Sequence, residues 1–285
     1  MLNKKLLVVA VLSLLLSACG QKSDSSSQAP APESVSKPAT PPTTPVDNTK
    51  PSTPSTAEPT TPADPAEIPL KYHMNKVYNI VPNEEGTEKK VVLLTFDDGP
   101  KEKVMIDGLI DVLDKHKAKA IFFVNGYRVK QNPDLLKLIH ERNQIIGNHS
   151  WDHISLKKQP EAKVKKQIED VQQAVKELTG QTPTFFRPPF GEGGDVGRKV
   201  AQDNHLLYMT WSNGSLDWTL KSKGTNNPET VVKNVLDQLH PGSNILMHEL
   251  PWTVAALDNL LTRLEEKGYS FVDPRSIDTN YKESK

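Results

Sequence analysis

The fold of this chain is decided by residues 91–124, VVLLTFDDGPKEKVMIDGLIDVLDKHKAKAIFFV. The apolar run from Val91 to Phe96 predicts a buried strand, and residues 104–116 repeat apolar side chains at helical spacing. A second apolar run, from Ala120 to Val124, predicts another strand directly after that helix. A strand, a helix and a strand in succession favour parallel pairing of the strands, with the helix covering one face of the sheet.

The same alternation continues toward the end of the chain. Further strands are predicted at 145–146, 184–186, 206–210, 245–247 and 269–272, and further helices at 133–142, 161–178, 196–204, 228–239 and 253–266. This order predicts an α/β fold, a distorted or incomplete (β/α) barrel of about seven parallel strands. A doubly wound open sheet is the structural alternative. In a barrel, the polar residues directly after each strand form the functional site.

The N-terminus has the organisation of a targeting segment. Lys4 and Lys5 precede a short apolar run, Leu6 to Leu16, which is too short to span a bilayer comfortably. The next residues, Leu16-Ser17-Ala18-Cys19, resemble the lipobox of bacterial lipoproteins. We therefore expect residues 1–19 to be a lipoprotein signal peptide, with Cys19 lipidated and anchored to the cell membrane. A plain secretory signal with an incidental cysteine is the alternative, and both predict an extracytoplasmic protein.

Residues 20–70 consist mainly of Pro, Ser, Thr and Ala. Such a segment cannot bury enough apolar surface to fold, so we expect a disordered tether. Its prolines favour extended geometry, which predicts a semi-stiff tether, and a spacer of no particular length requirement is the alternative. Residues 71–285 are long enough for one domain with its own core.

Charge and cysteine content exclude some partners and some kinds of site. Lys plus Arg equals Asp plus Glu, 35 against 35, so no global field would attract nucleic acid. The single cysteine excludes an intramolecular disulfide framework and any metal site built on several thiolates. A metal site in this chain therefore has to use histidine and carboxylate ligands.

Two adjacent carboxylates, Asp97 and Asp98, follow the first predicted strand in the sequence Thr95-Phe96-Asp97-Asp98-Gly99-Pro100. They repel one another unless a cation or an arginine neutralises them, and burial increases that cost. We therefore expect a positive group beside them. Taken alone, Asp-Asp-Gly-Pro is also an ordinary turn.

Two histidines four residues apart, His149 and His153, follow the third predicted strand. This spacing predicts that both imidazoles lie on one face of a helical turn, where they can converge on one metal ion. A helical metalloprotease site needs a glutamate directly after the first histidine, and Ser150 stands there instead. The pattern therefore disfavours a zinc peptidase of that kind, and two such histidines alone often have no function.

Three further polar segments follow later strands. In Arg187-Pro188-Pro189-Phe190-Gly191 the prolines stiffen the backbone and can hold the arginine against a carboxylate, and a solvated arginine on a stiff loop is the alternative. The segment from Ser215 to Trp218 supplies another acid, and the segment from Leu246 to His248 supplies another imidazole. Each segment alone is a weak signal.

In this order, the five segments resemble the motifs of the polysaccharide deacetylase family, carbohydrate esterase family four. The resemblance spans Thr95 to about His248. It implies that Asp98, His149 and His153 bind a divalent metal ion and that Asp97 is the catalytic base. Three protein ligands leave a coordination position for water, as in catalytic zinc sites. We expect zinc, with cobalt or nickel as alternatives, because a His-His-Asp site accepts several divalent ions.

The resemblance implies the remaining roles in the same way. Arg187 would pair with Asp97, Asp217 would orient His248, and His248 would protonate the departing sugar amine. An apolar pocket would receive the acetyl methyl group, and a backbone N–H would help to stabilise the oxyanion. The residues implied for this substrate pocket are Phe190, Trp218 and Leu246.

The activity implied by the resemblance is removal of acetyl groups from N-acetylglucosamine residues of peptidoglycan or a related surface polysaccharide. Family members often carry another Asp where this chain has Gly214, which puts the support of that loop in doubt. Relatives that deacetylate muramic acid commonly have Asn where this chain has Asp98, so Asp98 favours N-acetylglucosamine. The alternatives are an inactive or weakly active glycan-binding lipoprotein of the same fold, and a protein that adheres to the wall through its Pro-rich segment.

Overall fold

The computed structural model describes residues 68–281. The expected signal peptide at 1–19, with Cys19, and almost all of the expected tether at 20–70 lie outside the described residues. Within residues 68–281, no helix has the length and apolar character that crossing a membrane requires.

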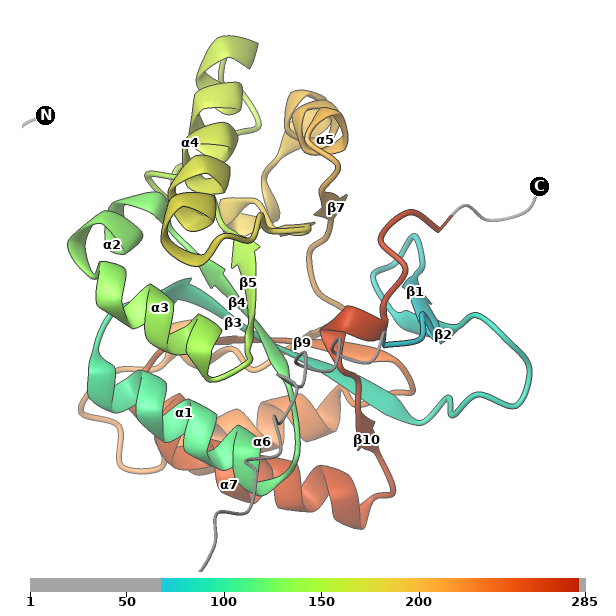
Figure 1. Cartoon of the computed structure of the whole chain (residues 1–285). Coiled ribbons are helices and arrows are strands. Elements are labelled where there is room, and N and C mark those ends of the chain that lie inside the picture. The colour runs from blue at the N-terminus through green and yellow to red at the C-terminus, as the bar shows by residue number, and fades with distance from the viewer. Residues whose placement is uncertain (1–67, 282–285) are drawn as a thin grey trace, which may run out of the picture. The chain divides into compact units, whose positions relative to one another are not determined.

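The described residues form a parallel sheet that curls into an incomplete barrel (Figure 1). Its order is β7-β6-β5-β4-β3-β9-β8, and β10 pairs with the beginning of β3. The strands therefore follow one another around the barrel in chain order, with the opening between β7 and β8. This confirms the predicted incomplete barrel of about seven parallel strands. The strands are β3 (Val91–Gly99), β4 (Ala120–Val124), β5 (Ile145–Asn148), β6 (Phe185–Phe186), β7 (Leu207–Tyr208), β8 (Asn213–Gly214), β9 (Ser243–His248) and β10 (Ser270–Phe271).

Helices cover the outside of the curled sheet (Figure 1). Six helices predicted from the apolar periodicity are confirmed, with both ends within two residues of the prediction. They are α1 (Lys103–Lys115), α3 (Pro133–Glu141), α4 (Glu161–Thr179), α5 (Gly194–Asp203), α6 (Asn227–Asp237) and α7 (Pro251–Glu266).

Several short elements were not predicted from the sequence. They are the antiparallel pair β1 (Tyr72–Met74) and β2 (Ile80–Pro82), helix α2 (Gly126–Gln131) and strand β8. Strand β8 is the dipeptide Asn-Gly, which has low strand propensity and forms a strand because it pairs with β9. Helix α2 is too short to show an apolar period.

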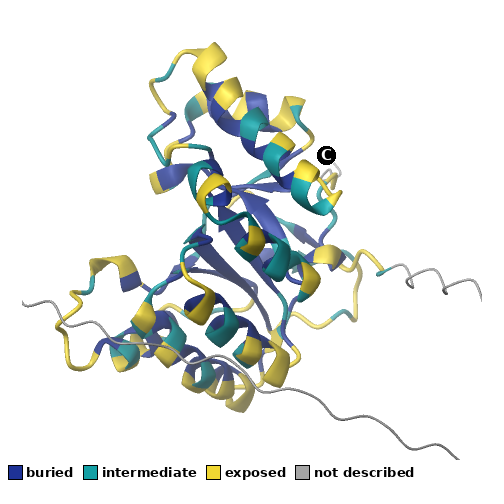
Figure 2. Cartoon of the chain, turned by 60° about the vertical axis from the view of Figure 1, so that its left-hand side comes forward, coloured by how far each residue is buried: buried dark blue, intermediate teal, exposed yellow. Residues whose placement is uncertain are grey.

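The strands of the sheet are largely buried (Figure 2). Strand β3 lies between β4 and β9 and is buried on both faces. Val92, Leu94 and Phe96 pack in the cluster that contains the apolar faces of the covering helices α1, α6 and α7. Val91 and Leu93 pack in a second cluster, with side chains of β4 and β6. Because side chains alternate along a strand, Thr95 and Asp97 fall on the same inner face as Leu93. The core thus determines which polar residues at the end of β3 point into the barrel.

Candidate active site

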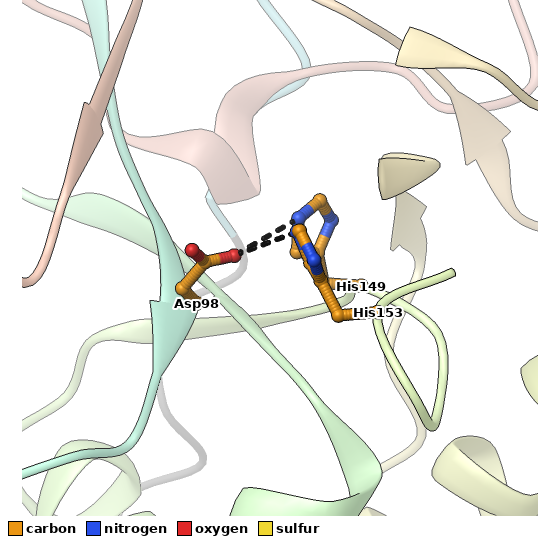
Figure 3. Close-up of side chains that lie close together, drawn as sticks. All are labelled: Asp98, His149 and His153. Carbon is orange, nitrogen blue, oxygen red and sulfur yellow. Dashed lines mark ion pairs between the residues drawn. The ribbon is translucent and has the colours of Figure 1, made fainter. Parts of the chain in front are cut away.

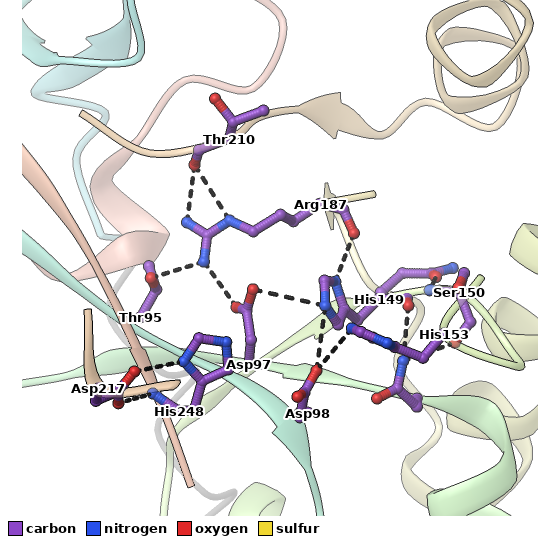
Figure 4. Close-up of polar contacts among 12 residues, drawn as sticks. Thr95, Asp97, Asp98, His149, Ser150, His153, Arg187, Thr210, Asp217 and His248 are labelled. Carbon is purple, nitrogen blue, oxygen red and sulfur yellow. Dashed lines mark hydrogen bonds and ion pairs between the residues drawn. The ribbon is translucent and has the colours of Figure 1, made fainter. Parts of the chain in front are cut away.

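Polar side chains from separate segments meet at the carboxyl ends of the strands (Figure 4). This is the edge at which the chemistry of a barrel is expected to collect. The contributing residues are Asp97 and Asp98 at the end of β3, His149 and His153 after β5, Arg187 after β6, Asp217 after β8 and His248 at the end of β9.

Asp97 forms a buried ion pair with Arg187. Arg187 Nη1 donates to Asp97 Oδ1 at 2.7 Å and to Thr95 Oγ1 at 2.8 Å, while Nε and Nη2 donate to the carbonyl oxygen of Thr210. The guanidinium carbon also lies 4.4 Å from the centre of the Phe123 ring. Burial lowers the pKa of Arg187, and the charge of Asp97 opposes that shift. Arg187 is therefore the positive group that the adjacent carboxylates were expected to require.

A backbone irregularity lets Asp97 and Asp98 face the same site. Neighbouring residues of a regular strand point to opposite faces of the sheet. Asp98 instead has a φ of 70°, and the register of β3 against β4 shifts between Asp97 and Gly99. Asp97 Oδ2 and Asp98 Oδ1 consequently lie 3.6 and 3.4 Å from the same atom, Nε2 of His149.

His149 and His153 do not lie on a helical turn, so that prediction was wrong. They belong to a loop that follows β5, in which Ser150 and His153 have φ values of 64° and 52°. Side-chain amides hold this loop: Asn148 Oδ1 accepts from the Ser150 N–H at 2.9 Å, and Asn125 Nδ2 donates to the His149 carbonyl at 2.8 Å. The two imidazole rings still converge, with centroids 5.1 Å apart.

The arrangement of Asp98, His149 and His153 suits a metal ion, because their ligand atoms all lie within 4.8 Å of one another (Figure 3). Asp98 Oδ1 lies 3.0 Å from His153 Nε2, yet this buried oxygen accepts no hydrogen bond from the described residues. His149 Nδ1 contacts the Arg187 carbonyl oxygen at 2.7 Å and must donate, because a carbonyl only accepts. If the His149 ring is neutral, its Nε2 lone pair points at the Asp98 carboxylate oxygen, and the two electron-rich atoms repel one another. A cation bound between Nε2 and this oxygen would remove the repulsion.

The electrostatics of Asp98 agree with a cationic environment. Burial by itself favours the neutral acid, but imidazole N–H groups of His149 and His153 turned toward Asp98 outweigh burial and hold its pKa well below its usual range, and a cation bound in place of those protons would act in the same direction. Asp98 is thus a carboxylate at neutral pH, and a carboxylate with two imidazole nitrogens is a donor set typical of zinc.

Asp217 holds His248 through two hydrogen bonds and is itself held by Thr253. Its Oδ1 accepts from His248 Nδ1 at 2.7 Å, and its Oδ2 accepts from the His248 N–H and from Thr253 Oγ1, each at 2.7 Å. Trp252 Nε1 donates to the backbone carbonyl of Asp217 at 2.9 Å. Although burial alone would lower the pKa of His248, the Asp217 carboxylate raises it above its usual value. His248 Nδ1 is occupied, which leaves Nε2 as the nitrogen for proton transfer.

A pocket of about 200 Å³ lies beside these groups. Its polar wall includes Asp98, Lys101 and His248, and its apolar wall includes Trp218 and Trp252. The edge of the Trp218 ring packs against His248, with centroids 5.3 Å apart. The pocket therefore brings an apolar surface next to the carboxylate and the imidazole.

The residues expected to form the substrate pocket have different positions. Trp218 lines the pocket described above and is 43% exposed. Leu246 is only 3% exposed and does not line it, because it lies within the parallel pairing of β9 with β3 and β8. Phe190 is 63% exposed and packs edge-on against His153, with centroids 4.8 Å apart.

Two residues that sequence reasoning set aside or missed support the site. Glu249 is buried, and its carboxylate accepts from the N–H groups of Lys101 and Glu102 at 2.9 and 2.8 Å. A Cβ at Gly99 would lie 2.7 Å from Glu249 Oε2, so a side chain at this position would have to displace the Glu249 carboxylate. Burial raises the pKa of Glu249, while these N–H groups oppose the shift. The sequence could have indicated Glu249, because it directly follows His248. Nothing in the sequence indicated Thr253, which donates to Asp217.

The fold and the site define a class of protein: an incomplete (β/α) barrel in which two histidines and a carboxylate can hold one cation beside Asp–Arg and Asp–His pairs. Residues 84–209 match the family described as polysaccharide deacetylase. The chain is also 35% identical over 202 residues to a peptidoglycan-N-acetylglucosamine deacetylase of Bacillus cereus, covering 69% of this chain and 71% of that protein. The chain therefore belongs to the polysaccharide deacetylase family, as its five motifs predicted.

Two further similarities bear on the function. The chain is 42% identical to the peptidoglycan-N-acetylglucosamine deacetylase PgdA of Listeria monocytogenes over 195 residues. The matched region is 68% of this chain and 39% of that protein. The chain thus spans about two fifths of that relative's length. Among solved structures, a carbohydrate esterase family 4 pseudoenzyme from Bacillus anthracis has a TM-score of 0.60 at 31% identity, over 65% of this chain and 63% of that chain.

Proposed function

We propose that this chain is a metal-dependent polysaccharide N-deacetylase that hydrolyses acetyl groups from N-acetylglucosamine residues of peptidoglycan or a related surface polysaccharide. The observation that carries the proposal is the convergence of Asp98, His149 and His153 beside Asp97, next to the pocket that contains His248. Such a site combines a cation position, a proton acceptor and a proton donor on separate side chains.

Asp98 Oδ1 and the Nε2 atoms of His149 and His153 would hold the divalent ion, for which we propose zinc. Nitrogen and oxygen donors suit zinc, and cobalt and nickel share this preference. When bound, the ion would lower the pKa of a water molecule and polarise the acetamide carbonyl. The bond from His149 Nδ1 to the Arg187 carbonyl fixes the ring in the tautomer that a metal ligand needs.

Asp97 is the proposed proton acceptor. Its Oδ1 is held by Arg187, while its Oδ2 faces the cation site at 3.6 Å from His149 Nε2. The carboxylate therefore has one oxygen fixed and one oxygen directed at the position of an attacking water molecule. The buried guanidinium of Arg187 lies 2.7 Å from Asp97 Oδ1, so this ion pair holds the carboxylate in place.

His248 is the proposed proton donor to the departing sugar amine. An amine leaves poorly as an anion, so a donor must protonate it as the carbon–nitrogen bond breaks. Asp217 keeps Nδ1 of the ring occupied and favours the cationic form, which leaves the Nε2 proton for transfer. His248 lines the same pocket as Asp98, so donor and cation site border one substrate position.

The substrate proposal is supported by the relatives and by the choice of residue at position 98. The Listeria monocytogenes and Bacillus cereus proteins are both named as deacetylases of peptidoglycan N-acetylglucosamine. The family resemblance at Asp98 also favours this sugar, because it implies Asn at that position in relatives that act on muramic acid. Trp218 provides an apolar wall of the size that a sugar ring or an acetyl methyl group can cover.

We also propose that lipidation of Cys19 anchors the protein to the outer face of the cell membrane, with residues 20–70 as a tether toward the cell wall. The motif Leu16-Ser17-Ala18-Cys19 supports this location. In cell fractionation, the wild-type chain should remain with membranes and Cys19→Ser should leave them. Equal membrane retention of the two proteins would contradict the anchor.

Acetate release from N-acetylglucosamine oligomers by the full chain tests the activity. We expect release that stops after chelation, returns with zinc or cobalt, and is lost in Asp97→Asn. The similarity to a Bacillus anthracis pseudoenzyme makes a non-catalytic glycan-binding protein the second candidate. Binding of the oligomers without acetate release, in protein shown to contain zinc, would favour that candidate.

A further inference from the structure

Asn125 follows strand β4, is fully buried and is the N-cap residue of helix α2. An N-cap asparagine usually accepts a hydrogen bond from the first turn of its own helix, but the Asn125 side chain forms no such bond. Its Nδ2 instead donates to the carbonyl oxygens of His149, at 2.8 Å, and Ser150, at 3.4 Å. Both partners only accept, so the NH₂ end of the amide has to face them. The side chain thus binds residues 149–153, the histidine loop, rather than its own helix.

The beginning of helix α2 binds the same loop through its backbone. The first N–H groups of a helix have no partner within that helix. Here the Gly126 N–H donates to the Ser150 carbonyl oxygen at 3.1 Å, and the next N–H, of Tyr127, donates to the Trp151 carbonyl oxygen at 3.1 Å. A Cβ at Gly126 would lie 2.1 Å from the Trp151 ring, so this ring packs directly on the glycine backbone. Together with the Asn125 amide, the start of α2 therefore holds three consecutive carbonyl groups of the histidine loop.

The histidine loop has a conformation that its own residues do not favour. Ser150 and His153 have φ values of 64° and 52°, in the left-handed region that residues other than glycine rarely adopt. Such strained residues persist only where the surrounding structure imposes them. The same loop brings Nε2 of His149 and of His153 to within 3.4 and 3.0 Å of one oxygen of Asp98. Contacts from outside the loop are therefore needed to keep the two imidazoles at the cation site.

We infer that Asn125 is a positioning residue for the metal site, and that its amide holds the histidine loop in the metal-binding conformation before an ion binds. This inference rests on the metal site of the function proposed above. The backbone N–H of Asn125 also donates to the carbonyl oxygen of Gly99 at 3.0 Å, directly after Asp98 in the chain. Asn125 thus joins the segment with the carboxylate ligand to the loop with both imidazole ligands. Without the amide, the buried His149 carbonyl loses a donor, and ion binding has to reorder the loop.

The test measures the zinc Kd of the full chain by competition with a chelator, starting from metal-free protein. Asn125→Ala removes the donor, and Asn125→Leu removes it while nearly keeping the volume of the side chain. We expect each variant to bind zinc about 10–100-fold more weakly than the wild-type chain, as is typical when a group that orients a metal ligand is removed. Urea unfolding of the metal-free proteins measures the loss of stability separately from the loss of zinc affinity.

Asn213→Ala is the matched control. Asn213 is also fully buried, and its Nδ2 donates to a backbone carbonyl oxygen, that of Val235, at 2.9 Å. It lies on β8, which is separated in the sheet from β5 and its histidine loop by β9, β3 and β4. Asn213→Ala should therefore destabilise the metal-free chain in urea, as Asn125→Ala does, but leave the zinc Kd unchanged.

Three results would overturn the inference. They are a wild-type zinc Kd in both Asn125 variants, an equal loss of zinc affinity in Asn213→Ala, and failure of both Asn125 variants to fold, which would make the residue necessary for the whole domain. If the wild-type chain itself binds no zinc, the proposed metal-dependent function fails, and the inference fails with it. Zinc binding by the wild-type chain separates the two, because the variants then test Asn125 alone.

Discussion

Replacing Asp217 with asparagine should destabilise the folded chain more at acidic than at alkaline pH. The carboxylate accepts two hydrogen bonds from His248 and one from Thr253, all at 2.7 Å. Asparagine keeps the shape but turns one acceptor oxygen into an NH₂ group. The backbone N–H of His248 can only donate, so the amide oxygen has to remain on that side. The NH₂ group must then face His248 Nδ1, which can accept only in the neutral ring.

The magnitude follows from the protonation state of His248. Its folded pKa is raised, chiefly by Asp217 against the effect of burial. The charged pair therefore stabilises the fold fully below the unfolded pKa of about 6.5, and this contribution is lost as pH rises through the folded value. A hydrogen bond between charged groups contributes about 1.5–3 kcal/mol, and a neutral one about 0.5–1.5 kcal/mol. We expect Asp217→Asn to cost about 2–3 kcal/mol near pH 5.5 and about 1 kcal/mol near pH 9.

Urea unfolding of both proteins at the two pH values, with metal removed by a chelator, measures this difference. The Asp98 cluster titrates in both proteins, so its effect cancels in the comparison. Thr253→Val is the control, because it removes one hydroxyl donor to Asp217 and should cost about 1 kcal/mol at either pH. An equal loss at both pH values for Asp217→Asn, or a larger loss at alkaline pH, would refute the charged His248 pair.

Three other predictions concern the metal site, the base and strand β8. Asp97→Asn should lower kcat for acetate release by roughly 10²–10⁴-fold while zinc still binds, and loss of zinc in a direct titration would reassign this residue. Zinc at about 100 times its Kd should stabilise the wild-type chain by about 2.7 kcal/mol, seen as a higher Tm. Asp98→Asn should remove most of this shift, and an unchanged shift would place the ion elsewhere. Gly214→Ala should stabilise the chain by about 0.4–1 kcal/mol in urea unfolding, since its Cβ would make ordinary contacts at 3.6 Å or more; a loss would mean that β8 requires glycine.

The barrel could be predicted because its signals are local. A continuous apolar run such as Val91 to Phe96 reports a strand buried on both faces, and periodic apolar residues report each covering helix. Strand β8 could not be found in this way, because Asn213 and Gly214 have no strand propensity and pair only because β9 lies beside them. The order of the motifs along the chain likewise indicated the family before any geometry was known.

The sequence alone determined which residue types follow each strand, and therefore the inventory of the site: paired carboxylates, two histidines, an arginine and an Asp–His pair. Only the tertiary structure decided how they face one another. Asp97 and Asp98 share a site because β3 breaks its register at a left-handed residue, and His149 meets His153 through a loop rather than a helix. The spacing of residues along the chain reports only local backbone geometry. The convergence of the metal-ligating side chains depends instead on segments that are far apart in the sequence.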